Sequence, residues 1–386
     1  MSSLKVVVYD NPDQVRTLQA AWDRLLREIP GYSASLDFEF AMCGWETLPE
    51  GRDAKLAVVT VWRDAALVCV WPMYTRREGL LRVAYHLGSG DMHEYAGPLV
   101  QDDETTAEVV GAALEAVKGL ADVARIYNIR VPSRVADVLG ADPTFKRRGS
   151  AVCPVVSLRG IPDWETWSKT ISKKMRTALR YERRRLGAMG RLEFREMAGP
   201  HDSVRCMDWI YARKREWLVA KNIRKSFILD PQNQEFFTKL AARPLRPDGK
   251  SYDVQTYALT LDDKIIAACI CLNSGDRLEF HTTTFDPAYS AHSPGSLMIE
   301  DCVNLAIQRG VDFDFRIAQQ SYKERWSDRL DRYDSFMFAC TPLGVVAIRI
   351  EMVRRWVHSL RVKYGPRIKA LLKRRPVPTT APAAGD

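Results

Sequence analysis

The 386-residue sequence lacks a long apolar run and any metal-binding spacing of cysteine and histidine. Its first residues, MSSLKVVVYDNPDQ, contain no basic stretch followed by an apolar one. No later segment reaches the roughly eighteen consecutive apolar residues of a membrane-spanning helix. The eight cysteines include no CxxC pair, and the six histidines form neither HxxxH nor HExxH. We therefore expect a cytoplasmic protein with reduced cysteines in its core and no bound metal.

The net positive charge is concentrated at the C-terminal end. Residues 341–386 contain ten Lys and Arg against two acids, which gives +8 of the net charge of +9. The remaining body is nearly neutral, so a surface that coats nucleic acid is not expected. Residues 376–386, PVPTTAPAAGD, have the composition of a disordered tail.

Two β-hairpin patterns occur about 200 residues apart. The first joins residues 55–62 to 66–74, and the second joins 254–261 to 264–272. Without gaps, TVWRDAALVCVW at Thr60 falls on TLDDKIIAACIC at Thr260, which indicates an internal duplication. We expect an N-terminal domain at 1–150 and a second domain at 151–340, because 386 residues exceed the usual size of one hydrophobic core.

Between the hairpins lies a basic helical region. Trp164, Ile171, Met175, Leu179 and Leu186 follow a helical apolar spacing, while residues 169–185 carry eight Lys and Arg on the other face. Such a face is either solvated or binds an anionic acceptor, for which Arg176 and Arg180 are our candidates.

A strand, loop, helix and strand follow the second hairpin. The pattern predicts a strand at 277–285, a loop at 286–295, a helix at 296–308 and a strand at 311–317. Pro294 and Gly295 stand at the start of the helix, where free N–H groups favour a phosphate. An ordinary strand-to-helix connection is the alternative.

Three segments together resemble a known family. They are ISKKMRTALRYERRRLGAMGRLEF at 171–194, FDPAYSAHSPGSLMIEDCVNLAIQRG at 285–310 and DFDFRIAQQSYKERW at 312–326. Their order and spacing are similar to the CelD/BcsL-like acyltransferases of the GNAT superfamily, which are associated with bacterial cellulose and exopolysaccharide biosynthesis. This branch is related in fold to the FemAB peptidoglycan aminoacyl transferases.

The resemblance implies a fold and a donor substrate. The expected fold class is α+β, with two tandem GNAT-like domains whose mixed, mostly antiparallel central sheets are flanked by helices. The implied donor is acetyl-CoA or another acyl-CoA, whose pyrophosphate meets the start of a helix. The matching positions for that contact are Ser293, Pro294, Gly295, Ser296 and Leu297.

Direct transfer to an amine requires a base, an acid for the thiolate and an oxyanion donor. We favour His281 as the base because an imidazole titrates near neutrality, although a histidine in a strand is often structural. Glu279 lies two residues before it and could orient or replace it. Asp314, two residues after Asp312, is a candidate for binding the acceptor.

The segment 318–323, AQQSYK, departs from the family, which often has a run similar to Gly-Asp-Glu-Pro-Tyr-Lys at this place. Two acids are replaced by amides, so this protein needs another proton acceptor or binds a different acceptor substrate. Gln319 is therefore a candidate substrate-binding residue. In the same segment, Tyr322 could protonate the thiolate and Lys323 could bind phosphate, with surface packing as the alternative for both.

The C-terminal segment, 341–375, predicts a basic amphipathic helix in which Gly365 and Pro366 produce a kink or a break. Three interpretations stay open: docking on the body, peripheral contact with the inner face of the cytoplasmic membrane, or binding of a regulatory nucleotide such as cyclic di-GMP. The last two would use Arg354, Arg355 and Arg361.

Three functions remain in competition. The first is an N-acyltransferase, in particular an N-acetyltransferase, acting on the amine of a sugar or of a cell-envelope or exopolysaccharide precursor. The second is a long-chain N-acyltransferase acting on a lipid amine at the membrane. The third is a non-catalytic effector that binds an anionic nucleotide. A tRNA-linked donor is disfavoured, because no coiled-coil insertion of the FemAB kind is evident.

Overall fold

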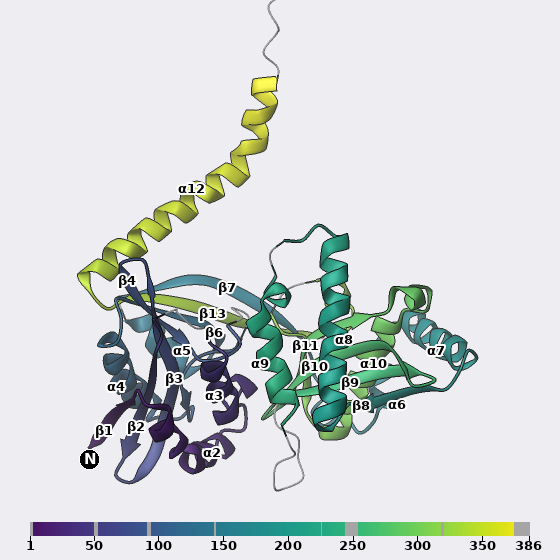
Figure 1. Ribbon diagram of the computed structural model, residues 1–386, viewed down its shortest axis with the longest axis horizontal. Coiled ribbons are helices and arrows are strands. Elements are labelled where there is room, and N and C mark those ends of the chain that lie inside the picture. The colour runs from purple at the N-terminus through teal and green to yellow at the C-terminus, as the bar shows by residue number, and fades with distance from the viewer. Residues whose placement is uncertain are drawn as a thin grey trace, which may run out of the picture.

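The computed structural model describes residues 3–49, 53–90, 94–142, 144–224, 226–243, 254–317 and 320–373. Within these residues one mixed sheet of thirteen strands runs through both halves of the molecule, with helices on its two faces (Figure 1). The predicted disordered tail, 376–386, lies outside the described residues.

The N-terminal half forms one end of the sheet. Its elements are β1 (Leu4–Tyr9), α1 (Pro12–Arg16), α2 (Gln19–Arg27), η1 (Ala34–Leu36), α3 (Phe38–Glu46), β2 (Lys55–Arg63), β3 (Ala66–Glu78), β4 (Leu81–His86), β5 (Leu99–Val100), α4 (Thr106–Lys118), β6 (Val123–Val131) and α5 (Arg134–Ala141). Short polar side chains start several of its helices: Asn11, Asp37 and Ser133 each accept a hydrogen bond from a backbone N–H of the first turn.

The C-terminal half forms the other end. Its elements are β7 (Phe145–Val156), α6 (Trp164–Ser168), α7 (Lys173–Gly187), β8 (Leu192–Glu196), α8 (Gly199–Ala220), η2 (Phe227–Leu229), α9 (Pro231–Ala241), β9 (Val254–Leu261), β10 (Lys264–Ser274), β11 (Arg277–Phe285), η3 (Pro287–His292), α10 (Pro294–Arg309), β12 (Asp312–Asp314), α11 (Ser321–Glu324), β13 (Arg329–Ala339) and α12 (Pro342–Lys373).

The two halves repeat one strand order. In the N-terminal half β1, β2, β3 and β4 pair antiparallel in sequence, and β4 then pairs parallel with β6. In the C-terminal half β8, β9, β10 and β11 do the same, and β11 pairs parallel with β12. The predicted hairpins are β2–β3 and β9–β10, so the duplication inferred from their spacing agrees with the topology.

A long ribbon of two strands, β7 and β13, joins the halves (Figure 1). β7 follows β6 and α5 of the N-terminal half along the chain but pairs with β12 of the C-terminal half, while β13, the last strand, lies between β6 and β7. The ribbon of β7 and β13 therefore completes the sheet of both halves. The domain boundary that we predict at residue 150 falls inside β7, and the boundaries stay a prediction.

Helices fill both faces of the C-terminal sheet with apolar side chains. One core lies between the sheet and α7 and α10, and includes Leu186, Phe280 and Met298. The other lies under α8 and α9, and includes Tyr211 and Phe237. This packing fixes the position of β11 from both sides.

Three local expectations need correction. The basic region is two helices, because Ser172 accepts a hydrogen bond from the Met175 N–H and starts α7 anew. The strand expected at 311–317 ends at Asp314, because Arg316 takes a left-handed conformation with φ of 57°. Of the kink or break expected at Gly365 and Pro366, the break is wrong, because α12 is one continuous helix that bends along its length (Figure 1).

α12 leaves the body at the N-terminal half (Figure 1). Its first turns are docked: Ile348 is buried in a core beneath β4, and Glu351 pairs with Arg125 at 3.3 Å. None of the helices in the described residues is long and apolar enough to cross a membrane.

Candidate active site

The most distinctive feature of the C-terminal half is a fork between β11 and β12. The strands pair in parallel through three residues each, and the last pair is Glu279 with Asp314. Beyond it the chain turns toward β7, where the Phe315 N–H donates to the Pro154 carbonyl at 3.0 Å. β11 continues to Phe285 and pairs only with β10, so in the described part of the chain its other edge, residues 280–285, has no strand partner.

A β-bulge lies at the start of this open edge. Cys271 faces Phe280 and Ile270 faces Thr282, which leaves His281 as the extra residue of β11. Its ring packs against Phe237 and Phe227, with ring centroids 4.4 and 5.6 Å away. His281 therefore points toward η2 and α9. Because Phe280 faces the opposite core, Glu279 shares the face of His281, as expected from the sequence.

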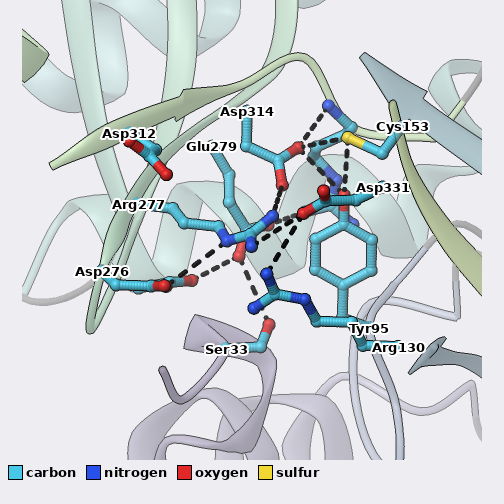
Figure 2. Close-up of polar contacts among 12 residues, drawn as sticks. Ser33, Tyr95, Arg130, Cys153, Asp276, Arg277, Glu279, Asp312, Asp314 and Asp331 are labelled. Atoms are coloured by element: carbon cyan, nitrogen blue, oxygen red, sulfur yellow. Dashed lines mark hydrogen bonds and ion pairs between the residues drawn. The ribbon is translucent and has the colours of Figure 1, made fainter. Parts of the chain in front are cut away.

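Glu279 lies at the base of the fork and is 1% exposed. Its carboxylate accepts hydrogen bonds from the hydroxyls of Ser274 and Ser33, the second at 3.3 Å, and pairs with Arg316 at 3.1 Å (Figure 2). Burial raises the pKa of this carboxyl, although the Arg316 guanidinium opposes the effect. The raised pKa makes this carboxylate a better proton acceptor than an ordinary glutamate.

Asp314 is fully buried and bound only by protein groups. It accepts hydrogen bonds from Tyr95 at 2.9 Å, Cys153 at 2.8 Å and the Arg316 N–H at 2.6 Å, and it pairs with Arg277 at 3.0 Å (Figure 2). This enclosure does not support our expectation that Asp314 binds the acceptor. It instead holds the turn that follows β12.

Asp312 is similarly enclosed. It accepts hydrogen bonds from the Leu158 N–H at 2.9 Å and the Arg159 N–H at 3.2 Å, and it pairs with Arg329 at 3.0 Å. These bonds lower the pKa of its carboxyl against the effect of burial. Asp312 therefore anchors β7 to β12.

The loop after β11 delivers the start of α10 next to the open edge. Ser293 has φ of 49° and ψ of 45°, and its carbonyl accepts the N–H groups of Ser296 at 2.9 Å and Leu297 at 3.3 Å. Pro294 has no N–H, and the Leu297 side chain is buried in the core. Of the five predicted donor-binding residues, Gly295 is therefore the one whose N–H has no acceptor among the described residues, and Ser293 and Ser296 are close to it in the chain.

Tyr322 and Lys323 lie on α11, on the other arm of the fork. Tyr322 packs edge-on against Phe315, and burial raises its pKa to about 12, so the phenol is protonated at neutral pH. Lys323 is 7% exposed and donates to the carbonyls of Phe315 at 2.8 Å and Arg316 at 3.4 Å. The structure therefore uses the Lys323 ammonium to hold the backbone after β12, rather than presenting it to phosphate. Gln319 lies outside the described residues.

The basic helix α7 contacts both η3 and α10, so it borders the same loop. Arg176 does not face solvent as expected, because its guanidinium donates to the carbonyls of Ser168 at 2.9 Å and Ile171 at 2.7 Å. Arg183 pairs with Glu300 and Asp301 on α10. Arg180 stays exposed and is available to an anion.

Sequence reasoning missed four residues of this region. Ser33 and Tyr95 come from the N-terminal half, and only the fold brings them to the fork. Arg316 depends on an unusual backbone conformation. Lys214 had a signal in the sequence, because it follows Met207, Ile210 and Tyr211 on the stripe of α8 that faces the sheet. Burial and the nearby Lys323 lower the pKa of Lys214 to about 8.

Three cysteines expected in the core do lie there, and they lie together. The Cys269 sulfur is 3.8 Å from that of Cys271 and 3.6 Å from that of Cys302. Within the described residues they form the one group of His, Cys and acidic side chains close enough to hold a metal. All three thiols are free and buried between β10 and α10. The absence of a metal stays a prediction.

The tail residues Arg354 and Arg355 are exposed on α12, and Arg355 pairs with Glu351 at 2.9 Å. The side chain of Arg361 lies outside the described residues.

Comparisons with known proteins agree with this geometry. A domain described as "Acetyltransferase (GNAT) domain" matches residues 173–324, which run from the start of α7 to the end of α11. No curated protein sequence matches the chain.

Solved structures of similar shape extend the likeness to both halves. The crystal structure of FemX is similar with a TM-score of 0.57 at 10% identity, covering 86% of this chain and 96% of that one. L-PGS from Bacillus licheniformis has a TM-score of 0.51 at 15% identity, covering 88% and 96%. A conserved protein of unknown function from Bacteroides thetaiotaomicron has a TM-score of 0.50 at 12% identity, covering 87% and 99%. The protein therefore has a tandem GNAT-like fold, and at these identities the likeness concerns the fold alone.

Proposed function

We propose that the C-terminal half is an acyltransferase that takes an acyl group from acetyl-CoA or another acyl-CoA and transfers it directly to an amine. The open edge of β11 carries this proposal. An extended chain with amide groups can pair with residues 280–285 as an added strand would. The pantetheine arm of CoA is such a chain, and the matched GNAT domain spans this edge.

The start of α10 supports the same donor. A pyrophosphate near Gly295 would meet its N–H, the two serine hydroxyls and the positive end of a 16-residue helix. Arg180 on α7 borders this loop and would add a positive charge at its rim. The donor thioester would then lie along the edge toward the bulge at His281.

The chemistry needs few protein groups. The amine attacks the thioester carbon, and N–H groups of the open edge stabilise the oxyanion of the tetrahedral intermediate. The C–S bond then breaks and the amide forms. Glu279, which is enclosed by protein groups, takes the ammonium proton through water, and Tyr322 protonates the departing thiolate. His281 is the second candidate for the base, while Asp314 positions the turn that holds Arg316.

For the acceptor we propose a sugar amine or a related precursor of the cell envelope or an exopolysaccharide. This assignment is supported by the similarity of 171–194, 285–310 and 312–326 to the CelD/BcsL-like family. A long-chain acyl donor with a lipid amine acceptor is the second candidate, and it is favoured by the exposed apolar and basic α12. Binding of cyclic di-GMP to Arg354, Arg355 and Arg361 rests on their charge alone.

The test of the donor is calorimetric titration of the full-length protein with acetyl-CoA, palmitoyl-CoA and desulfo-CoA. We expect saturable binding at one site for at least one acyl-CoA, and release of free thiol on addition of an amine acceptor. Chain-length preference separates the sugar-amine candidate from the lipid-amine candidate. Absence of heat with all three ligands would overturn the proposal, and binding of cyclic di-GMP alone would favour an effector.

A further inference from the structure

We propose that the protruding part of α12 lies on an anionic lipid surface, with its apolar stripe among the lipids and its arginines at the headgroups. This inference goes beyond acyl transfer and does not rest on it. It starts from a helix that leaves the body instead of packing on it (Figure 1).

The stripe consists of Leu343, Val346, Ile350, Val353 and Val357. Their spacing of three and four residues places them on one side of the helix. The first four are large apolar side chains left exposed, Val353 by 59%. Trp356, next to the stripe, is 63% exposed. A soluble surface rarely leaves so many large apolar side chains together without a partner.

The body does not cover this stripe. Its own contact with α12 uses a different face, through Ile348 and the pair between Glu351 and Arg125. At Gly344 the approach is so close that a Cβ atom would lie 1.9 Å from the Asp122 carbonyl oxygen. The docked first turns therefore fix the direction of the helix while the stripe stays outside.

The charge beside the stripe decides between an anionic lipid surface and a second copy of α12 as its partner. The same spacing of three and four residues is that of a coiled coil, so a second copy of α12 is the obvious alternative. Arg349 and Arg354 flank the stripe, and a parallel pair of helices would bring Arg349 of one copy against Arg354 of the other. Residues 352–373 contain no Asp or Glu that could compensate. Like charges oppose a second copy, whereas anionic lipid headgroups attract all of them.

Trp356 also fits a lipid surface as the partner of the stripe. Tryptophan prefers the boundary between headgroups and acyl chains, and Trp356 projects at the edge between stripe and cations. Because no helix in the described residues can span a bilayer, α12 would lie along the surface. The fold would then be held beside a membrane by the face of α12 that points away from the body.

The experiment is co-sedimentation of the full-length protein with vesicles of phosphatidylcholine, or of phosphatidylcholine containing about 30% phosphatidylglycerol. We expect binding to the anionic vesicles to exceed binding to the neutral ones at least about tenfold, and to fall with added salt. The double variant Val353→Ser/Trp356→Ser and the double variant Arg349→Glu/Arg354→Glu should each lose about tenfold or more.

The matched control is Lys173→Glu/Lys174→Glu, which makes the same change in net charge on the exposed start of α7. This control should reduce binding to the anionic vesicles much less than Arg349→Glu/Arg354→Glu on α12 does. Equal weak binding to both vesicles, or equal losses from the two charge reversals, would overturn the proposal. A dimer in sedimentation velocity that Val353→Ser/Trp356→Ser dissociates would assign the stripe to a second copy. Unchanged acyl-CoA binding by the two α12 variants keeps this test separate from that of the proposed function.

Discussion

The two halves share a strand order but differ at the fork. In the C-terminal half the last parallel pair is Glu279 with Asp314, and beyond it the edge of β11 is open. In the N-terminal half the corresponding last pair is Ala84 with Ala124, two buried apolar residues. The same backbone geometry therefore occurs twice, but acidic groups stand at its base only once.

The N-terminal fork is also filled by its own chain. The Ala96 N–H donates to the Tyr127 carbonyl at 3.2 Å, and the Asn128 side chain donates to the Glu94 carbonyl at 2.8 Å. The segment 94–96 thus lies against β6 where a ligand would have to enter. The difference indicates that one half provides the site and the other supports it.

A histidine stands at the same place in both forks. His86 stands two residues after the last parallel pair of the N-terminal fork, as His281 does in the C-terminal one. His86 contacts the Ser35 carbonyl at 3.1 Å, and burial lowers its pKa to about 4. A histidine at this position is therefore compatible with a purely structural role. Glu279 is what distinguishes the C-terminal fork, so we place it ahead of His281 as the base.

The largest expected effect is the loss of acyl-CoA binding when a negative charge is placed at the start of α10 but not at the start of the matching helix α4. Gly295→Glu, at the second position of α10, should abolish measurable acyl-CoA binding, because a carboxylate would lie beside the donor phosphates. Ala107→Glu, at the second position of α4, should leave the dissociation constant within about twofold. Calorimetry on both variants makes the comparison.

A further variant separates charge from bulk. A Cβ atom at Gly295 would lie 3.4 Å from the ring of Phe285, which is itself partly exposed and can shift. Gly295→Ala should therefore bind acyl-CoA within a few fold of the parent protein. If Gly295→Glu binds normally, or Ala107→Glu fails to bind, the donor site is wrongly placed.

The next largest effect concerns the base. Glu279→Gln should lower kcat about 100-fold with little change in donor KM, because the amide cannot take the ammonium proton. Burial raises the pKa of Glu279 above its ordinary value of 4.5, and the carboxylate is the active form. The rate of the parent protein should therefore rise with pH through that raised pKa, and the variant should lose this limb.

A pH series on Glu279→Gln and His281→Gln decides between the two candidates. Retention of the rising limb in Glu279→Gln, together with its loss in His281→Gln, would transfer the role to the histidine. Calorimetric binding of acyl-CoA serves as the control for folding of both variants.

The smallest effect tests how the N-terminal half supports the fork. Tyr95→Phe removes the hydroxyl that donates to Asp314 at 2.9 Å in a fully buried site. We expect the free energy of unfolding to fall by about 1–2 kcal/mol. Tyr9→Phe, on the outer strand β1, should change it by less than about 0.5 kcal/mol. Denaturant titration measures both, and equal effects would remove the distinction between the two sites.

Local patterns predicted much of the fold because they depend on neighbouring residues. β9 and β11 begin and end where alternation and turns predict, and α10 begins two residues before and ends one residue after the predicted helix. The open edge, in contrast, follows from the divergence of β12, which depends on the conformation of Arg316. The sequence also could not show that β7 and β13 are exchanged between the halves, because strand partners distant in the chain leave no periodic signal.

The candidate site residues fall into the same two groups, those predicted from neighbouring residues and those that depend on tertiary contacts. Glu279 and Gly295 could be located from their own strand and helix. The enclosure of Asp314 and the bonds of Arg176 and Lys323 to carbonyl groups depend on tertiary contacts that composition does not record. Charged residues in a motif were thus easier to find than to assign, since burial decides whether a charge serves a ligand or the backbone.

The exchanged ribbon has a consequence for how such a protein can change over time. A duplicated domain that loses its own site is normally free to be deleted. Here the N-terminal half borders β13, and β7 closes the sheet of the C-terminal half next to β12. Removing the first half would leave a long strand edge exposed in the second. The two halves are therefore mechanically dependent on each other, so neither could be deleted without exposing that edge.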